Sequence, residues 1–491
     1  MDPVNFARGN KSNTARVIKP ILRAYALGYL SSTTPRLLSS VQRLRRGDLT
    51  CNEKLQELVR ILTNAIRLNS FPSFCAFLIG GSTVFPVLIF QLCGLVTRRL
   101  GSRANVLTSK ASARLVRFAA ALVSSWFSFQ LLNQKPIRLE RVNGHLDHHP
   151  EKANASNQLH RGVGEQKSFE FAGRTMDLTI FTLTRAVDAI ACIAWAAWCR
   201  SRKAKGRWTS VEAAAPRFAD AGVFALSAAV VMWAWFYVPE RLPKSYGKWI
   251  SEAAKVDTRL IEALRRARMG KFVYGKDTGQ APLLQSMCKD YNWPIEWGDP
   301  AKTIPVPCEM VHMGCGPSCE KHAVFRFAKS FKFACAMYFP LQIAFRLRSI
   351  RSMSIFLRTV KDATWSSCFL ASFVSLFYYG VCLARTRLGP KIFDAKTVTP
   401  LMWDSGLCVG TGCFMCGWSI LAENVRRRQE MALFVAPRAA AAVLPRVYEK
   451  KYQYRERAAF ALSAAVVMIC LQERPSMVRG VFGSIGSSVL K

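Results

Sequence analysis

The sequence predicts an all-α integral membrane protein with two parallel pseudo-repeats of four transmembrane helices each, plus helices that lie at the membrane interface. Three observations predict this fold class. Hydrophobic residues make up 51% of the 491 residues although the formal net charge is +38, apolar and charged residues occupy separate blocks, and the nonapeptide FALSAAVVM occurs at both 224–232 and 460–468. An identical match of nine residues inside two apolar runs indicates an internal duplication.

The apolar blocks are long enough to cross a bilayer. Six runs lack Asp, Glu, Lys, Arg and His: residues 68–97, 118–134, 221–239, 363–384, 405–422 and 458–472. A spanning helix needs roughly 17 to 25 apolar residues; the last run is shorter but contains the second nonapeptide. Two more segments, 178–199 and 431–445, are apolar apart from a few charges, which gives eight predicted spans. A soluble helical protein is the alternative, but its buried helices are usually shorter and amphipathic.

Polar and basic segments between the apolar runs divide the chain into five parts. We expect a disordered basic tail at 1–15, a first four-span module at 16–239, a soluble connector at 240–325, a second four-span module at 326–475 and a tail at 476–491. Because each module has an even number of spans, both begin on the same side of the membrane, as parallel repeats do. In the connector, helical spacing puts Leu260, Ile261 and Leu264 on one side of a helix and neighbouring arginines on another.

The positive charge indicates contact with lipid and not with nucleic acid. Basic residues are spread over loops such as 98–117 and 199–219, without the aromatic and basic platform that binds single-stranded nucleic acid. The lipid bilayer and anionic phospholipids are therefore the expected partners. The first 65 residues contain no apolar core of a signal peptide, which favours direct insertion into an intracellular membrane. The termini and the connector are basic too, so the orientation stays open.

Enzyme signatures are missing from the chain. It has no GxxxxGKS or GxxxxGKT loop, no HExxH, no GxSxG and no GxGxxG after a strand. No catalytic residues are therefore expected. Many of the 16 cysteines lie within apolar runs, which does not resemble an extracellular disulfide framework, and we expect them to be reduced.

Charged residues inside the predicted spans are candidate site residues. Arg185 and Asp188 are three residues apart in the third span and so share one helical face. They form either an ion pair that holds helices together or the polar lining of a path for a solute or peptide. Arg438 stands at the matching place of the second module without an adjacent acidic partner. Its expected partner lies on another helix, and Asp404 and Glu423 are the candidates.

A charged cluster follows the sixth span and consists of Glu423, Arg426, Arg427 and Arg428. It is either a solvated turn or a site for an anionic lipid headgroup, since each basic residue near a charged membrane contributes about 1 kcal/mol. The span before it contains Gly406-x-x-x-Gly410, a spacing that lets helices approach closely. Helix packing is the first interpretation of these glycines, and a lateral groove is the second.

The connector ends in a cysteine and histidine cluster with the pattern Cys308-x3-His312-x2-Cys315-x3-Cys319-x2-His322. Zinc takes four such ligands, although its sites usually combine two separated ligand pairs. Zinc binding, a local disulfide and a purely structural cluster are the open alternatives. No other cofactor is indicated.

Several segments resemble the Transmembrane protein 135 family. They are TRAVDAI (184–190), LPKSYGKWI (242–250), the cluster at 308–319 running into FKFACAMYFP, and SILAENVRRRQEMALFVAPRA (419–439). That family is related to the four-span modules of peroxisomal membrane proteins and of mitochondrial inner-membrane translocases, and the resemblance covers about two thirds of the chain in the same order.

The resemblance implies a non-enzymatic multipass protein of peroxisomal or mitochondrial membranes that acts in lipid handling or organelle membrane organisation. A homo-oligomer or other organelle membrane proteins are the further partners it suggests. A transporter or channel for a small solute or lipid through the repeat interface is the first alternative. A metal-dependent membrane enzyme is the second.

Overall fold

The computed structural model describes residues 12–44, 51–99, 110–134, 137–138, 170–346 and 352–490. The chain forms two compact units, one of Met1–Arg207 with Pro445–Lys491 (unit 1) and one of Trp208–Leu444 (unit 2). Most of the predicted basic tail, residues 100–109 of the first basic loop, and most of the polar stretch at 135–174 lie outside the described residues. Residues 12–15 of the predicted tail belong to a helix.

Within the described ranges, six helical segments are long and apolar enough to cross a membrane: Leu55–Gln91, Ala111–Leu132, Met176–Ala204, Ser210–Tyr237, Met353–Ile392 and Pro400–Ala422. The other two predicted spans correspond to α16 (Val425–Val443) and α17 (Gln453–Glu473), which are long helices with clusters of charged residues in their first turns. A multipass, all-helical membrane protein is therefore supported by six spans. The eight-span repeat stays a prediction.

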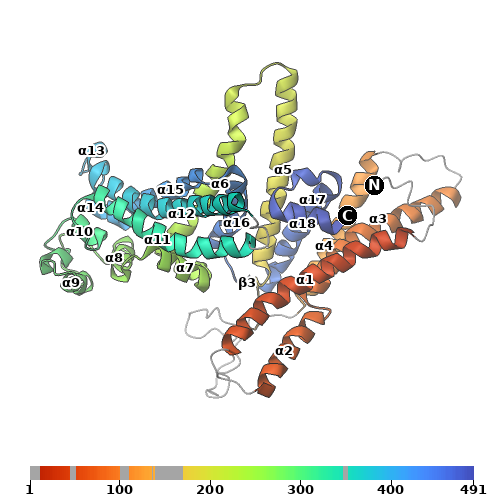
Figure 1. Cartoon of the computed structure of the whole chain (residues 1–491), viewed down its shortest axis with the longest axis horizontal. Coiled ribbons are helices and arrows are strands. Elements are labelled where there is room, and N and C mark those ends of the chain that lie inside the picture. Colours follow the sequence, from red (N-terminus) through yellow and green to blue (C-terminus); the bar gives the residue numbers. More distant parts are fainter. Residues whose placement is uncertain are drawn as a thin grey trace. The chain divides into compact units, whose positions relative to one another are not determined.

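Unit 1 is built from α1 (Ser12–Leu44), α2 (Cys51–Ile66), α3 (Phe71–Arg99), α4 (Lys110–Leu132), α5 (Met176–Ala204), α17 and α18 (Gly480–Leu490). Helix α1 packs along α3, α3 packs on α4, and α17 packs on both α4 and α5 (Figure 1). Phe74, Phe129 and Phe460 are buried together at the centre of these contacts. Helix α18 lies where the sequence predicted a tail.

Short strands and turns complete unit 1. Among its described residues, β1 (Ile137–Arg138), β2 (Glu170–Ala172) and β3 (Tyr448–Glu449) form an antiparallel sheet in the order β1-β2-β3. Phe171 of β2 pairs with Ile137 on one side and Glu449 on the other. The turns are η8 (Lys450–Tyr452) and η9 (Pro475–Met477).

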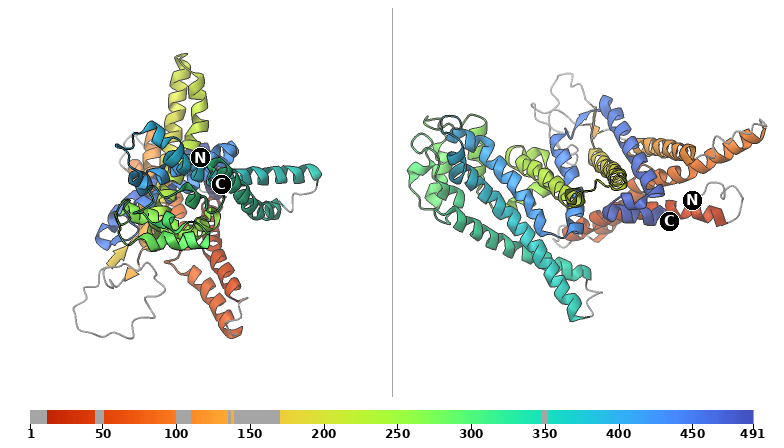
Figure 2. Two further views of the ribbon diagram at one scale, coloured as in Figure 1. Left: turned by 90° about the vertical axis from the view of Figure 1, so that its left-hand side faces the viewer. Right: turned by 90° about the horizontal axis from the view of Figure 1, so that it is seen from above.

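A helical bundle in unit 2 is formed by α6 (Ser210–Tyr237), α11 (Cys319–Arg346), α12 (Met353–Cys382), α15 (Cys408–Cys416) and α16. Of these helices, α6, α12 and α15 lie in candidate membrane spans. Helices α11 and α12 lie side by side (Figures 1 and 2), α12 packs on α15, and α6 packs on α15 and α16. Short elements link them: η5 (Leu383–Arg387), α13 (Gly389–Ile392), α14 (Pro400–Met402), η6 (Trp403–Leu407) and η7 (Gly417–Ala422). Both η5 and η6 are π-helical.

The predicted connector is folded and belongs to unit 2. It contains η3 (Pro239–Arg241), α7 (Lys244–Ala254), α8 (Thr258–Arg268), α9 (Ala281–Asp290), η4 (Ile295–Gly298) and α10 (Cys308–His312). Phe272, Leu284, Met287 and Met310 are buried in its own small core. The amphipathic helix predicted in its middle is confirmed as α8, in which Leu260 and Ile261 are buried.

The two copies of FALSAAVVM lie in α6 and α17, and each packs in a different unit. Helix α6 was expected to complete the first module but packs with the helices of the second, and α17 does the reverse. Phe460 of α17 packs on Phe74, with ring centroids 5.8 Å apart. The two copies have identical residues, so the nonapeptide itself does not determine which helical bundle each copy joins. The compact units therefore differ from the expected modules at 16–239 and 326–475.

Candidate functional site

A groove of about 590 Å³ opens on unit 2. Its walls come from the end of α6, the end of α8 and the segment that runs from α14 through η6 into α15. The apolar walls include Met402, Leu407 and Phe414, whose exposed fractions are 44%, 45% and 53%. Helix α6 and the segment 400–422 are both candidate spans, so these side chains suit a hydrocarbon environment.

Glycines give the groove its depth. A Cβ atom on Gly406 would lie 2.9 Å from Arg268 Nη1 and 3.2 Å from the ring of Trp233, and a Cβ atom on Gly410 would lie 3.5 Å from the same ring. Larger side chains would therefore fill the groove at Gly410 and displace Arg268 at Gly406. The Gly406-x-x-x-Gly410 spacing thus forms a groove surface.

Close helix packing is made by other glycines of the same segment. A Cβ atom on Gly412 would lie 2.7 Å from the carbonyl oxygen of Phe377 on α12, and one on Gly417 would lie 2.4 Å from Cα of Ala225 on α6. Ala225 belongs to the first nonapeptide. Small residues on both partners let these backbones approach one another.

Arg268 supplies the charge in the lining of the groove. Its guanidinium carbon lies 4.7 Å from the ring centroid of Trp233 and 4.9 Å from that of Tyr237, which are cation–π distances. Nη1 also donates to the carbonyl oxygen of Ser405 at 3.4 Å. A guanidinium has five N–H donors in a planar fork. Arg268 is therefore held in place while its exposed edge can bind an anion.

A buried ion pair fixes η6, which carries the groove. Arg385 of η5 donates to Asp404 of η6 through Nε at 2.6 Å and Nη2 at 2.9 Å, and both side chains are buried. Tyr274 donates its hydroxyl hydrogen to Asp404 and accepts from the Val306 backbone N–H at 3.3 Å. Burial raises the pKa of Tyr274, so its phenol stays protonated as a donor. The bidentate geometry is the strong form of this contact.

Asp404, one candidate partner of Arg438, is thus paired with Arg385. Arg438 instead lies near Tyr246 of α7: burial raises the pKa of this tyrosine, and the charge of Arg438 opposes the rise. The other candidate, Glu423, has Arg427 as its partner, with 3.7 Å between Oε1 and Nη1. These pairings depend on tertiary contacts, which the sequence does not reveal.

The membrane charges Arg185 and Asp188 meet Arg479, which precedes α18. Arg479 Nε lies 3.2 Å from both carboxylate oxygens of Asp188, and its Nη2 also donates to Asp188. Arg185 donates to the backbone carbonyl of Arg479 at 3.3 Å and lies 5.1 Å from the ring centroid of Phe181. Arg185 is buried. These contacts fit the interpretation that the charges hold helices together, and neither residue lines the groove.

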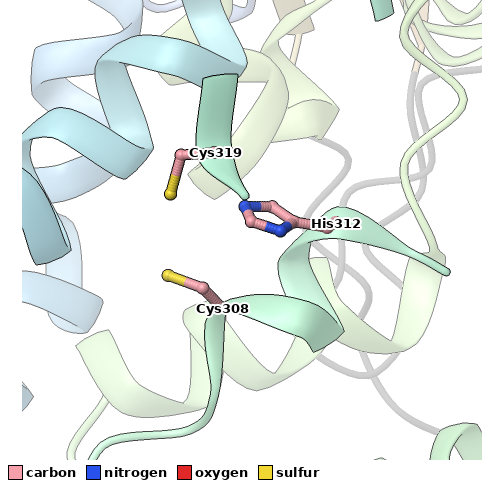
Figure 3. Close-up of side chains that lie close together, drawn as sticks. All are labelled: Cys308, His312 and Cys319. Carbon is pink, nitrogen blue, oxygen red and sulfur yellow. The ribbon is translucent and has the colours of Figure 1, made fainter. Parts of the chain in front are cut away.

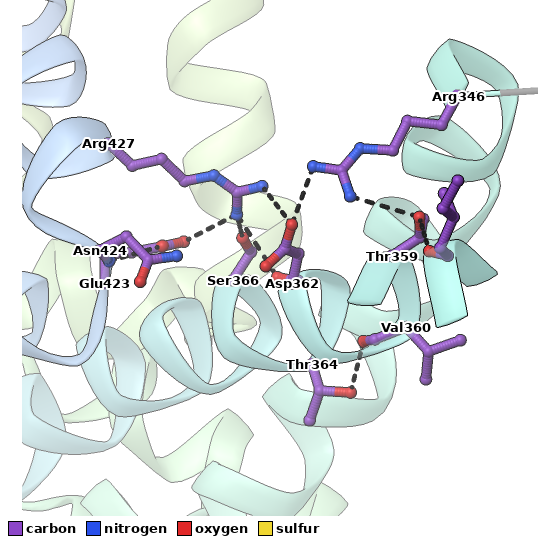
Figure 4. Close-up of polar contacts among 10 residues, drawn as sticks. Arg346, Thr359, Val360, Asp362, Thr364, Ser366, Glu423, Asn424 and Arg427 are labelled. Atoms are coloured by element: carbon purple, nitrogen blue, oxygen red, sulfur yellow. Dashed lines mark hydrogen bonds and ion pairs between the residues drawn. The ribbon is translucent and has the colours of Figure 1, made fainter. Parts of the chain in front are cut away.

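The cluster at 423–428 takes part in a polar network of unit 2 (Figure 4). Arg427 donates to the hydroxyl of Ser366 and to the carbonyl oxygen of Asp362. The Asp362 carboxylate accepts from Arg346 of α11 at 2.8 Å. Glu423 is buried. The network therefore joins α11, α12 and α16.

The three arginines of this cluster have different surroundings. Arg428 donates to the backbone carbonyl oxygens of Glu423 at 2.7 Å and Leu421 at 2.6 Å, which stabilises the end of η7. Arg427 is held by the network described above. Arg426 is exposed. Of the three, Arg426 has the surroundings that the predicted headgroup contact requires.

Three of the five predicted metal ligands converge. The ligand atoms of Cys308, His312 and Cys319 all lie within 4.8 Å of one another, and their side chains point toward a common centre (Figure 3). Cys315 and His322 lie outside this group. His322 is fully buried and stacks on His312, with ring centroids 4.5 Å apart.

A fourth candidate ligand, a thiol, lies beside this group and was not predicted from the sequence. Cys382, at the end of α12, has its Sγ 3.5 Å from His312 Nε2. The sequence pattern gave no signal for it because Cys382 sits in an apolar run far along the chain from the cluster. The structure thus offers two sites: an apolar groove with one cation, which suits an amphipathic anion, and a thiol and imidazole cluster, which suits a soft metal ion. No protein-family model, no curated protein and no solved structure matches this chain.

Proposed function

We propose that this protein is a non-enzymatic multipass membrane protein that binds an anionic membrane lipid in the groove of unit 2. The observation that carries this proposal is that the groove combines apolar walls with the guanidinium of Arg268. An acyl chain can cover Met402, Leu407 and Phe414 without leaving polar groups unpaired. A phosphate can accept charge-assisted hydrogen bonds from Arg268.

The lining of the groove favours a lipid over a small polar solute. Ligand sites are mostly apolar with a few placed polar groups that fix orientation. Arg268 is the charged residue among those that line the groove. It is the last residue of α8 in the connector, while the apolar walls belong to candidate spans. An anionic lipid has a matching arrangement, with a charged headgroup next to an apolar acyl chain.

The proposed repeat architecture and organelle are based on the sequence. The repeated nonapeptide supports two four-span pseudo-repeats. The resemblance to the Transmembrane protein 135 family supports a peroxisomal or mitochondrial membrane and a role in lipid handling or membrane organisation. Microscopy of the tagged protein against markers of both organelles tests this address, and a plasma-membrane signal would show that it is wrong.

Lipid binding is tested by mass spectrometry of lipids that copurify with the protein in mild detergent. We expect anionic phospholipid to copurify with the wild type and to decrease in Arg268→Gln, which removes the charge, and in Gly410→Leu, which fills the groove. Lys289→Gln is the matched control, because it removes an exposed positive charge of the connector outside the groove. Unchanged lipid in both groove variants, or an equal loss in Lys289→Gln, would contradict the proposal.

A further inference from the structure

The four side chains Cys308, His312, Cys319 and Cys382 come from three elements that meet at one end of α12. Cys308 and His312 begin and end α10, Cys319 begins α11, and Cys382 ends α12. Residues four apart on a helical turn share a face, which explains why Cys308 and His312 point the same way. The Cys308, His312 and Cys319 ligand atoms lie within 4.8 Å of one another, and Cys382 Sγ lies 3.5 Å from His312 Nε2. Cys382 thus adds a fourth soft ligand beside the three that converge.

The imidazole of His312 is oriented as a metal ligand would be. Its Nδ1 lies 2.7 Å from the carbonyl oxygen of Gly316. A carbonyl oxygen can only accept, so Nδ1 carries the proton and Nε2 keeps its lone pair. That lone pair faces Cys382. Ligating histidines commonly hold their second nitrogen by such a bond to a backbone carbonyl, which fixes the tautomer and the ring orientation.

Residues of η5 lie close to the thiols. The Thr386 hydroxyl oxygen lies 3.6 Å from Cys308 Sγ and 3.8 Å from Cys319 Sγ, and the hydroxyl donates to the Cys382 carbonyl oxygen at 2.8 Å. The positive charge of Arg385 acts on Cys308, and that of Arg387 acts on Cys319. Nearby positive charge favours the thiolate form that binds a metal. A π-helical turn directly after a ligand is also a frequent mark of functional sites.

We propose that Cys308, His312, Cys319 and Cys382 bind one zinc ion in a tetrahedral site that joins the folded connector to α12. Three sulfur ligands and one imidazole form a common structural zinc set, with Zn–S distances of about 2.3 Å and Zn–N distances of about 2.0 Å. Ligand atoms in such a tetrahedron lie about 3.3–3.8 Å apart by the same geometry. The 3.5 Å between Cys382 Sγ and His312 Nε2 falls in this range. The site is independent of lipid binding.

The binding step balances in protons and charge. The three thiols lose three protons to solvent, and the ion takes the three thiolates and neutral His312 Nε2 as ligands. The product carries one negative charge, from three thiolates and one Zn²⁺. Arg385 and Arg387, which pair with Asp404 and Glu320, are positive charges close to the cluster.

The test is metal analysis of the full-length protein purified in detergent under reducing conditions. We expect about one zinc per chain in the wild type. Cys319→Ser and Cys382→Ser each lose at least about tenfold in zinc affinity, since even outer-shell changes cost about 10–100-fold. Cys315→Ser is the matched control, because Cys315 belongs to the same sequence pattern but lies outside the four ligands, and it keeps the metal.

Two further measurements distinguish the loss of a zinc ligand from a failure of the variant to fold. Cys382→His retains a ligand and is expected to keep zinc, so its failure to do so would count against the assignment. Wild-type protein stripped with a chelator and reloaded with Co²⁺ is expected to show the thiolate charge-transfer absorption of a tetrahedral site. Wild type that contains no zinc and binds no Co²⁺, a Cys382→Ser variant that keeps its metal, or a disulfide among these cysteines in the purified protein would overturn the proposal.

Discussion

The ring of Phe224 packs edge-on against the ring of Phe369, with centroids 5.7 Å apart. Phe224 opens the first nonapeptide, on α6, and Phe369 lies on α12. Phe460 opens the second nonapeptide, and it packs on Phe74 and Phe129 in unit 1. Each copy of the nonapeptide thus places its phenylalanine in the centre of a helical bundle. The repeat serves packing, and it does so in both units.

Replacing either phenylalanine by alanine is expected to destabilise its bundle. Truncating a fully buried Phe costs about 3–5 kcal/mol, and Phe224 and Phe460 are both buried. Thermal unfolding of the detergent-purified protein, followed by tryptophan fluorescence, measures the effect. Phe218→Ala is the matched control on α6, because Phe218 is 59% exposed. If Phe218→Ala lowered the unfolding temperature as much as Phe224→Ala, the packing of Phe224 on Phe369 would not be the source of the stability.

Sequence periodicity predicted the features that depend on local patterns. The apolar runs predicted membrane helices, and the spacing of Leu260 and Ile261 predicted α8. The features that depend on contacts between distant segments could not be predicted. Identical copies of FALSAAVVM do not reveal which bundle each joins, and nothing near Asp188 points to Arg479. Cys382 looked like another apolar residue of its span, because a thiol becomes a candidate ligand only when other ligands surround it.

The pair of Asp188 and Arg479 is expected to stabilise unit 1 without acting on lipid. Their side chains are 10% and 28% exposed, so this pair is only partly screened by solvent. We expect Asp188→Asn to cost about 1.5–3 kcal/mol, as for loss of a hydrogen bond to a charged group. A double-mutant cycle with Arg479→Gln should give a coupling energy of about 0.5–3 kcal/mol. If Asp188→Asn altered copurified lipid with stability unchanged, a role in a solute path would gain support.

Asp257 is expected to make the position of α8, and hence of Arg268, dependent on pH. Its side chain caps α8 by accepting the Arg259 backbone N–H at 2.9 Å, and it pairs with the Arg259 side chain. The hydrogen bond from the Arg259 side chain lowers the pKa of Asp257. A lowered pKa in the folded state contributes stability above the ordinary value of about 3.9, and this contribution is lost as the pH falls through the folded value.

Asp257→Ala is therefore expected to cost about 1 kcal/mol at neutral pH, the usual cost of losing a helix cap. The difference between variant and wild type should narrow below about pH 4, near the ordinary aspartate pKa. Limited proteolysis of the connector across this range measures it. Asp290→Ala is the control, since Asp290 also pairs with Arg259 but its side chain is 63% exposed and such pairs contribute little. A difference that stays constant down to pH 3 would contradict the assignment.

The buried pair of Arg385 and Asp404 is expected to control the groove through η6. Asp404→Asn leaves the Arg385 charge buried without its counter-charge, which costs about 3–5 kcal/mol in comparable sites. Tyr274→Phe removes only the phenol that donates to Asp404 and is expected to cost about 1.5–3 kcal/mol, as for a hydrogen bond to a charged group. Because Gly406 belongs to the same turn as Asp404 and lies against Arg268, both variants should lower lipid copurification in proportion to their instability. If the two variants were equally destabilised, the ion pair of Arg385 and Asp404 would contribute no more than the hydrogen bond from Tyr274. The apolar contacts of η6 would then be what holds it in place.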